Sequence, residues 1–125
     1  ELRRVLICWN GGRAAARAVQ DALPFLRRAG AIDILAVNED EEVVGQATAD
    51  ALRNHLLHHE LAPEVHHLTA PPFNIHNTIL SFAGDVGADL LVMGGYGHSR
   101  LREFILGGVT RGMFKSLTVP ALISH

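Results

Sequence analysis

Two groups of glycines near the carboxyl end of the chain could hold a ligand through the main chain. They belong to the stretch "GGYGHSRLREFILGG" and comprise Gly94, Gly95, Gly97, Gly107 and Gly108. Residues 99–106 between them read as a short helix. Glycine is used where the backbone takes a positive φ or lies very close to another group. We therefore expect backbone N–H groups in this stretch to bind a ligand.

An anion, and phosphate above all, is the ligand that such a stretch suits best. One helix is expected to start near Ser99 and another after Gly108, and each helix start offers unpaired N–H groups and partial positive charge. Ser99, Arg100 and Thr110 could add hydroxyl and charged donors. His98 lies inside the glycine loop, where contact with a phosphate and a plain loop role are equally open.

Two familiar phosphate-binding motifs do not fit these glycines. A Walker loop needs a Gly-Lys pair, which occurs nowhere in the chain. A dinucleotide fingerprint needs G-x-G-x-x-G, yet Gly95 and Gly97 are followed by Arg100 at the third glycine position. A conventional NTPase and a nicotinamide dehydrogenase are thus disfavoured. The alternative that the glycines only end a strand and begin a helix stays open.

The elements that would position this loop alternate along the chain. Apolar runs predict strands, and apolar residues at helical spacing predict helices. The expected strands are 4–9, 31–37, 64–68, 89–93 and 119–124, and the expected helices are 13–28, 47–61, 74–86 and 110–117. This order predicts an α/β fold over a single domain, residues 1–125, with a doubly wound, Rossmann-like five-stranded parallel sheet and helices on both faces.

Three residues should shape the ends and the course of these helices. Pro24 lies inside the first helix and should kink or open it. Pro63 is expected to end the second helix, and Asn74 to cap the third. Ligands of such sheets lie beyond the carboxyl ends of the strands, where the strand order reverses. The connections after Trp9, Val37 and Met93 therefore form the candidate site.

Composition narrows the function classes. The 125 residues are 48% apolar and 19% charged with a net charge of -2, which argues against a nucleic-acid partner. The arginines, Arg3 and Arg4 among them, are spread over separate elements and read as solvated surface. There is no run of eighteen apolar residues and no signal peptide before Val5, so neither a membrane span nor secretion is indicated and we expect a cytoplasmic protein. Cys8 reads as a small buried hydrophobe.

Histidines and carboxylates give weaker indications. His55 and His59 lie one helical turn apart beside His58, yet no third ligand stands at a supporting spacing, so a solvated helix face is favoured over zinc. His66 and His67 should point to opposite faces of a strand. Among the carboxylates, Glu39 and Asp40 could hold Mg²⁺, because they follow the second strand at its carboxyl end. Asp85 and Asp89 are expected at the opposite end of the sheet.

The glycine stretch resembles the universal stress protein family. That family's signature is G-x-x-G, nine residues, then G followed by Ser or Thr, and residues 94–97 with Gly107 keep this spacing. The opening "VLICWNGGRAAARAV" is similar to the family's first strand and helix, "ILAVNED" to its second strand and "TVPALISH" to its last strand. The start at Glu1 and the short connection after the second strand further resemble one domain cut from a tandem member.

The resemblance implies nucleotide binding and dimerisation. One branch of the family binds ATP, so the implied ligand is ATP or another adenine nucleotide, with Mg²⁺ as a candidate companion. Asn10 and Val37 would meet the adenine and ribose. The residues implied around the phosphates are Met93, Gly94, Gly97, Gly107, Gly108, Val109 and Thr110. The last strand, with Val119, Leu122 and Ile123, would pair with a second copy or with a tandem domain.

Two departures from the ATP-binding pattern leave three functions open. Gly108 stands where a hydroxyl donor is expected, and Asn10 stands where that branch has Asp. Loss of one hydrogen bond to a charged phosphate costs about 1.5 to 3 kcal/mol, which binding can survive. The favoured hypothesis is a non-enzymatic nucleotide-binding stress-response domain that acts by signalling or partner interaction. The alternatives are a dimerisation or scaffold domain with a vestigial site, and a slow ATPase or phosphotransferase.

Overall fold

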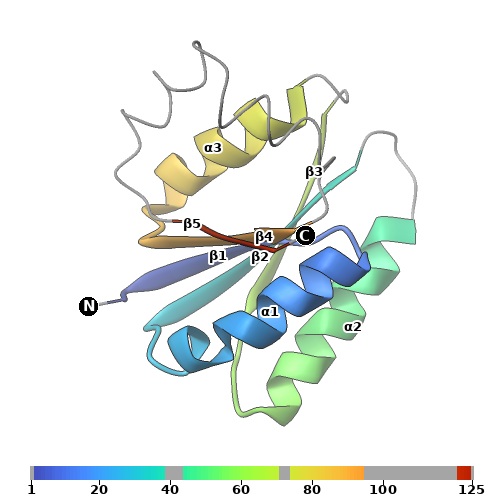
Figure 1. The fold of residues 1–125 in the computed structure, drawn as a ribbon. Helices are drawn as coiled ribbons and strands as arrows, with labels where there is room; N and C mark the ends of the chain where they lie inside the picture. Colours follow the sequence, from blue (N-terminus) through green and yellow to red (C-terminus); the bar gives the residue numbers. More distant parts are fainter. Residues whose placement is uncertain (1, 39–43, 71–73, 95–120, 125) are drawn as a thin grey trace.

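A five-stranded parallel sheet forms the centre of the molecule. The computed structural model describes residues 2–38, 44–70, 74–94 and 121–124. Every strand pairs in parallel, in the order β3-β2-β1-β4-β5, and Figure 1 shows α1 and α2 on one face of the sheet and α3 on the other. The elements are β1 (Arg4–Cys8), α1 (Arg13–Leu26), β2 (Ala31–Asn38), α2 (Val44–His58), β3 (Glu64–Thr69), α3 (Ile75–Val86), β4 (Leu90–Gly94) and β5 (Ala121–Ser124). The predicted α/β fold is confirmed.

Alternate residues of each central strand supply the cores of two layers. Val5 and Ile7 of β1 pack into the cluster on the side of α1 and α2, whereas Leu6 and Cys8 pack into the cluster beneath α3. All four side chains are at most 1% exposed. A strand between two helical layers must be apolar on both faces, which is why β1 reads as an uninterrupted apolar run.

The helix ends differ from the predicted ones for local reasons. α1 runs through Pro24 and stops at Leu26, so the proline falls in its last turn. α2 ends at His58, well before Pro63, because Glu60 takes a positive φ of 63° and the chain turns there. Position Asn74 is the N-cap of α3 as predicted, although its side chain makes no capping bond to the backbone.

The strand order reverses between β1 and β4, and β5 forms an edge. β2 and β3 lie to one side of β1, and β4 and β5 to the other. Leu122 of β5 is partly buried against the core on the α1 side. It therefore adds less exposed apolar surface to this edge than the sequence suggested. Val119 lies outside the described residues. In the part of the chain that the structure describes, no helix is long and apolar enough to cross a membrane.

Cys8 is a buried thiol in the layer beneath α3, as predicted. It is 1% exposed and unpaired. Desolvation by this burial raises the pKa of the Cys8 thiol far above its ordinary value, so the reactive thiolate is disfavoured. The residue acts in packing.

Asp89 ties the amino ends of β1 and β4 together. Its Oδ2 accepts hydrogen bonds from the N–H groups of Arg3, at 2.9 Å, and Arg4, at 3.1 Å. The bond from Arg3, followed by that from Arg4, holds the pKa of Asp89 below its ordinary value of 3.8. Asp89 precedes β4 and so lies at the end of the sheet opposite Gly94, as the sequence predicted for it.

Because the folded state favours ionised Asp89, we expect its stabilising contribution to be complete above pH 3.8 and to be lost as the pH falls below that value. Urea unfolding of the wild type and Asp89→Asn should show a constant difference in free energy near neutral pH that shrinks in acid. Asp85→Asn, an exposed change on α3, is the control. A difference between the wild type and Asp89→Asn that persists unchanged to pH 2 would contradict this assignment.

Candidate functional site

The carboxyl ends of β1, β2 and β4 bring four of the predicted site residues to one edge of the sheet. Cys8, the last residue of β1, pairs with Leu35 of β2 on one side and with Met93 of β4 on the other. The Trp9 N–H donates to the Leu35 carbonyl at 2.9 Å, which extends the pairing one residue further. Asn10 follows directly. Asn10, Val37, Met93 and Gly94 therefore gather around the point where the strand order reverses, as predicted.

Val37 and Met93 present their main chain, and not their side chains, at this edge of the sheet. Val37 is 7% exposed and Met93 is 4% exposed, and both side chains pack in the core cluster beneath α3. Gly94 ends β4 and is buried. A ligand above this edge would thus meet backbone N–H and carbonyl groups at β2 and β4, which is the kind of contact that the glycines suggested.

Asn10 shapes the turn that leads into α1. Its side-chain oxygen accepts the N–H of Gly12 at 2.9 Å. Gly11 between them has a φ of 79°, a conformation that glycine adopts without strain. The exposed Asn10 amide is neutral, so it adds no negative charge near a phosphate-bearing ligand, whereas an aspartate would.

The remaining predicted site residues lie outside the described part of the chain. They are Gly97, His98, Ser99, Arg100, Gly107, Gly108, Val109 and Thr110, together with the two carboxylates considered for Mg²⁺, Glu39 and Asp40. Their roles remain predictions from the sequence.

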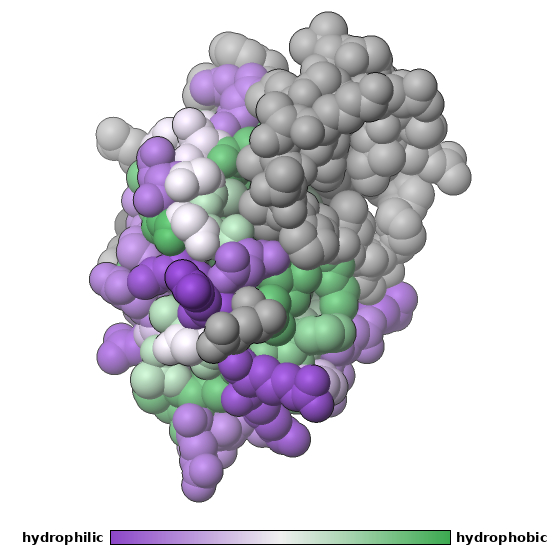
Figure 2. Space-filling model, turned by 90° about the vertical axis from the view of Figure 1, so that its left-hand side faces the viewer, coloured by the Kyte–Doolittle hydropathy of each residue, from purple (hydrophilic) through white to green (hydrophobic). Residues whose placement is uncertain are grey.

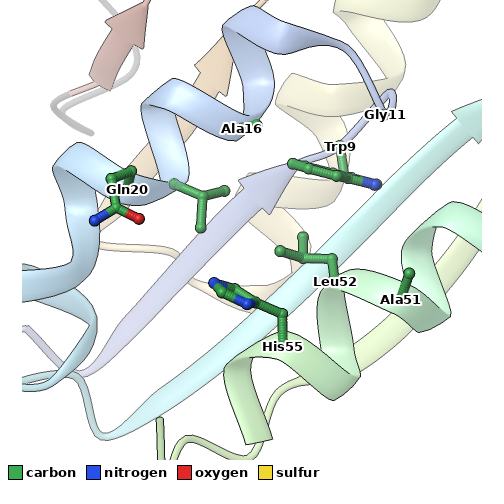
Figure 3. Close-up of a pocket in the computed structure, with 8 residues that line it drawn as sticks. Trp9, Gly11, Ala16, Gln20, Ala51, Leu52 and His55 are labelled. Atoms are coloured by element: carbon green, nitrogen blue, oxygen red, sulfur yellow. The ribbon is translucent and has the colours of Figure 1, made fainter. Parts of the chain in front are cut away.

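A pocket of about 390 Å³ lies between α1 and α2, and nothing in the sequence indicated it. Figure 3 shows the Trp9 ring at the end next to the Gly11 turn, with Gln20 and His55 further along the two helices and Leu52 between. Its lining is mostly apolar, and its volume falls in the range of small-molecule sites. It arises from the packing of two helices, which single-sequence periodicity does not describe.

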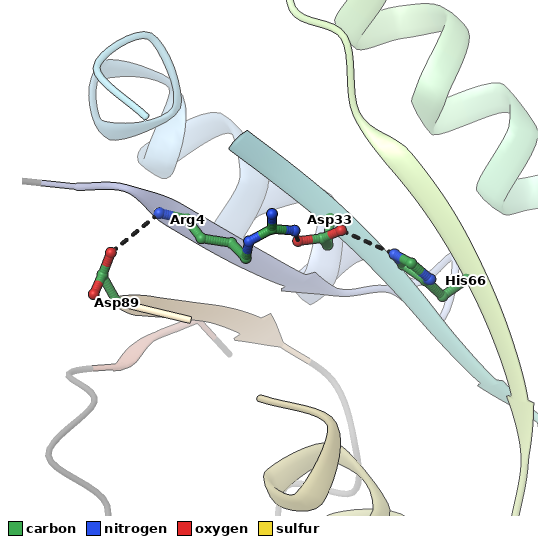
Figure 4. A network of polar contacts seen from close by, with 4 residues as sticks. All are labelled: Arg4, Asp33, His66 and Asp89. Carbon is green, nitrogen blue, oxygen red and sulfur yellow. Dashed lines mark hydrogen bonds and ion pairs between the residues drawn. The ribbon is translucent and has the colours of Figure 1, made fainter. Parts of the chain in front are cut away.

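A polar network crosses three strands in the layer beneath α3, and the sequence reading missed it. Asp33 of β2 is 1% exposed, and its Oδ2 accepts a bond from Arg4 Nη1 of β1 at 2.7 Å. Its Oδ1 accepts a bond from His66 Nε2 of β3 at 2.9 Å (Figure 4). The reading of Arg4 as solvated surface was wrong in this respect, because its 37% exposed side chain holds a buried carboxylate. The available signal was one acidic residue inside the apolar run "AIDILAV".

The histidines on the surface of α2 and β3 are arranged largely as predicted. His55 of α2 and His59, the first residue after that helix, have ring centroids 4.9 Å apart. On β3, His66 packs against Phe82 of α3, with ring centroids 4.9 Å apart, while His67 is exposed. The alternation of a strand keeps His66 and His67 on opposite faces.

Comparison with known proteins agrees with the fold. The model of the universal stress protein family matches residues 1–125. Universal stress protein MJ0577 of Methanocaldococcus jannaschii is 38% identical over 48 residues, a match that covers 38% of this chain and 30% of that relative's length.

Two solved structures share the fold over nearly the whole chain. A universal stress protein in complex with cAMP has a TM-score of 0.71 at 21% identity and covers 99% of this chain and 97% of its own. A family protein from Arabidopsis thaliana with AMP bound has a TM-score of 0.60 at 18% identity and covers 98% and 90%. With the glycine spacing, the five-stranded order and the family model in agreement, the chain belongs to the universal stress protein family.

Proposed function

We propose that this chain is a non-enzymatic stress-response domain that binds an adenine nucleotide, ATP in the first instance, and signals by changing its surface or its partners when occupied. The gathering of Asn10, Val37, Met93 and Gly94 where the strand order reverses is the observation on which the proposal rests. Two proteins of the same fold are described with cAMP and with AMP, which supports this ligand class.

The proposed contacts divide between the two ends of the nucleotide. Asn10 and the main chain at Val37 would hold the adenine and ribose. The glycine segment, residues 94–110, would surround the phosphates with backbone N–H groups, and Mg²⁺ would screen the phosphate charge. Binding through the main chain tolerates Gly108, because only the hydroxyl donor is missing there and the N–H remains.

We further infer that β5 pairs this domain with a second copy, or with a tandem domain, in the cytoplasm. β5 occupies an edge of the sheet, and an open edge is an available surface for strand or side-chain pairing. Should the nucleotide site prove vestigial, this pairing would be the remaining function, and the domain would be a stable dimer with an empty cleft.

Titration with ATP and Mg²⁺ tests the proposal. We expect a saturable heat of binding with one site per chain, accompanied by a change in the fluorescence of Trp9, which is the only tryptophan and adjoins Asn10. Absence of heat and of a thermal shift at millimolar ATP would refute nucleotide binding. Phosphate release that disappears in a Gly107→Val variant would instead identify a slow ATPase, since contaminating activity does not depend on that residue.

A further inference from the structure

The polar network beneath α3 has the composition of a metal site, at the edge of the sheet opposite the nucleotide site. Asp33, Glu64 and His66 each offer one ligand atom, and these atoms all lie within 4.8 Å of one another. We propose that Asp33, Glu64 and His66 bind a divalent cation such as Zn²⁺, while Arg4 bonds the second oxygen of Asp33 and orients its carboxylate. This site is separate from the proposed function and does not depend on it.

The strand register explains why the three ligands converge. Asp33 of β2 pairs directly with Glu64 of β3, so their side chains leave neighbouring backbone positions. Glu64 and His66 are two residues apart on β3, and residues at that spacing share a face of a strand. Phe82 of α3 packs against the His66 ring and restricts its orientation. Rigid elements thus fix two ligands, while the exposed Glu64 supplies the third.

The distance between His66 and Asp33 requires little movement, and the exposed Glu64 side chain would close the rest of the site. His66 Nε2 and Asp33 Oδ1 lie 2.9 Å apart and share one proton. Two ligands at zinc distances around a tetrahedral centre stand about 3.3 Å apart, so the ion replaces that proton with a shift of a few tenths of an ångström. Water would complete the coordination, because His66 is 26% exposed and Glu64 faces solvent. Figure 2 shows the side from which the N-terminus projects, where hydrophilic side chains are interspersed with apolar surface.

Arg4 is compatible with a cation here. It bonds Oδ2 of Asp33 at 2.7 Å and leaves Oδ1 to face His66 (Figure 4). Carboxylates that bind metals commonly receive such an outer hydrogen bond, which orients them. The charge balance also favours an ion, because the site holds two carboxylates and the one guanidinium in contact with it bonds Asp33 alone. Imidazole nitrogen with carboxylate oxygens is a donor set that zinc accepts.

Calorimetric titration of the chain with Zn²⁺ tests the site. We expect one ion per chain with a micromolar dissociation constant, weakened at least tenfold in Glu64→Gln and at least a hundredfold in His66→Gln. Two variants serve as controls and should bind like the wild type. They are His67→Gln, on the opposite face of β3, and His55→Gln/His59→Gln, which removes the close histidine pair at the end of α2. Glu64 is exposed, so Glu64→Gln should stay folded even if His66→Gln does not.

Cobalt gives an independent reading of the same site. Co²⁺ should give visible absorption bands of a four- or five-coordinate ion in the wild type, and Glu64→Gln should weaken them. No Zn²⁺ binding below millimolar concentration would overturn the proposal. Binding that survives both Glu64→Gln and His66→Gln but is lost in His55→Gln/His59→Gln would also overturn it, because the ion would then lie at the end of α2.

Discussion

The variant Gly97→Val should lose ATP binding by at least about a hundredfold in dissociation constant, which corresponds to about 2.7 kcal/mol. A branched side chain at this position would separate the phosphates from the backbone N–H groups that are proposed to bind them, and it would disfavour any positive φ that the loop uses. The effect should appear equally in calorimetry and in the Trp9 fluorescence titration.

A matched control exists for this change on α3. Gly84 faces open space, with nothing within 4 Å of a Cβ added there, so Gly84→Val introduces the same side chain without obstruction. It should bind ATP like the wild type. Circular dichroism must show that both variants are folded. A folded Gly97→Val that binds ATP as tightly as Gly84→Val would contradict the role assigned to the glycine loop.

The variant Arg4→Met should lower the free energy of unfolding by about 2 kcal/mol, because it leaves the buried Asp33 carboxylate with His66 as the remaining partner of the two in the network. The loss should fall below the 3 to 5 kcal/mol that is typical of fully buried pairs. The reason is that Arg4 is 37% exposed, so water already screens the pair. Urea denaturation followed by circular dichroism measures the change.

The double variant Arg4→Met/Asp33→Leu tests the cause of that loss. Removal of the carboxylate removes the buried charge that has lost Arg4, and a leucine would join the apolar cluster beneath α3, so at least half of the lost stability should return. Arg3→Met, a change of the exposed neighbouring arginine, should stay within about 0.5 kcal/mol of the wild type. Effects of Arg4→Met and Asp33→Leu that simply add would show that the two side chains are not energetically coupled.

The apolar runs predicted the sheet because burial on both faces leaves a strong and simple pattern. β1 and β4 are apolar at nearly every position, and the structure places both in the middle of the sheet. The end of α2 was predicted three residues late. Pro63 can be recognised in the sequence as a residue that ends helices. The helix ends before it, at the turn where Glu60 has a positive φ, and no residue type there predicts such a turn.

The residues at the carboxyl ends of the strands were easier to place from the sequence than those of the polar network near the amino ends. The carboxyl edge follows from topology, since parallel strands with an order reversal place Asn10, Val37 and Met93 together. The network of Arg4, Asp33 and His66 depends on which strands become neighbours and in what register. Because β3 reaches Asp33 only through its pairing with β2, residues 33 positions apart in the sequence meet by a contact that periodicity does not contain.

Amide chemical shifts of the ¹⁵N-labelled chain, followed while ATP and Mg²⁺ are added, locate the nucleotide most directly. The N–H signals of Asn10, Val37 and Gly94 should move together and saturate with one dissociation constant, while those of Asp33, His66 and Asp89 at the opposite edge stay in place. If the nucleotide left the first three signals unchanged, or moved only those of the pocket between α1 and α2, this chain would not bind nucleotide where its strand order reverses.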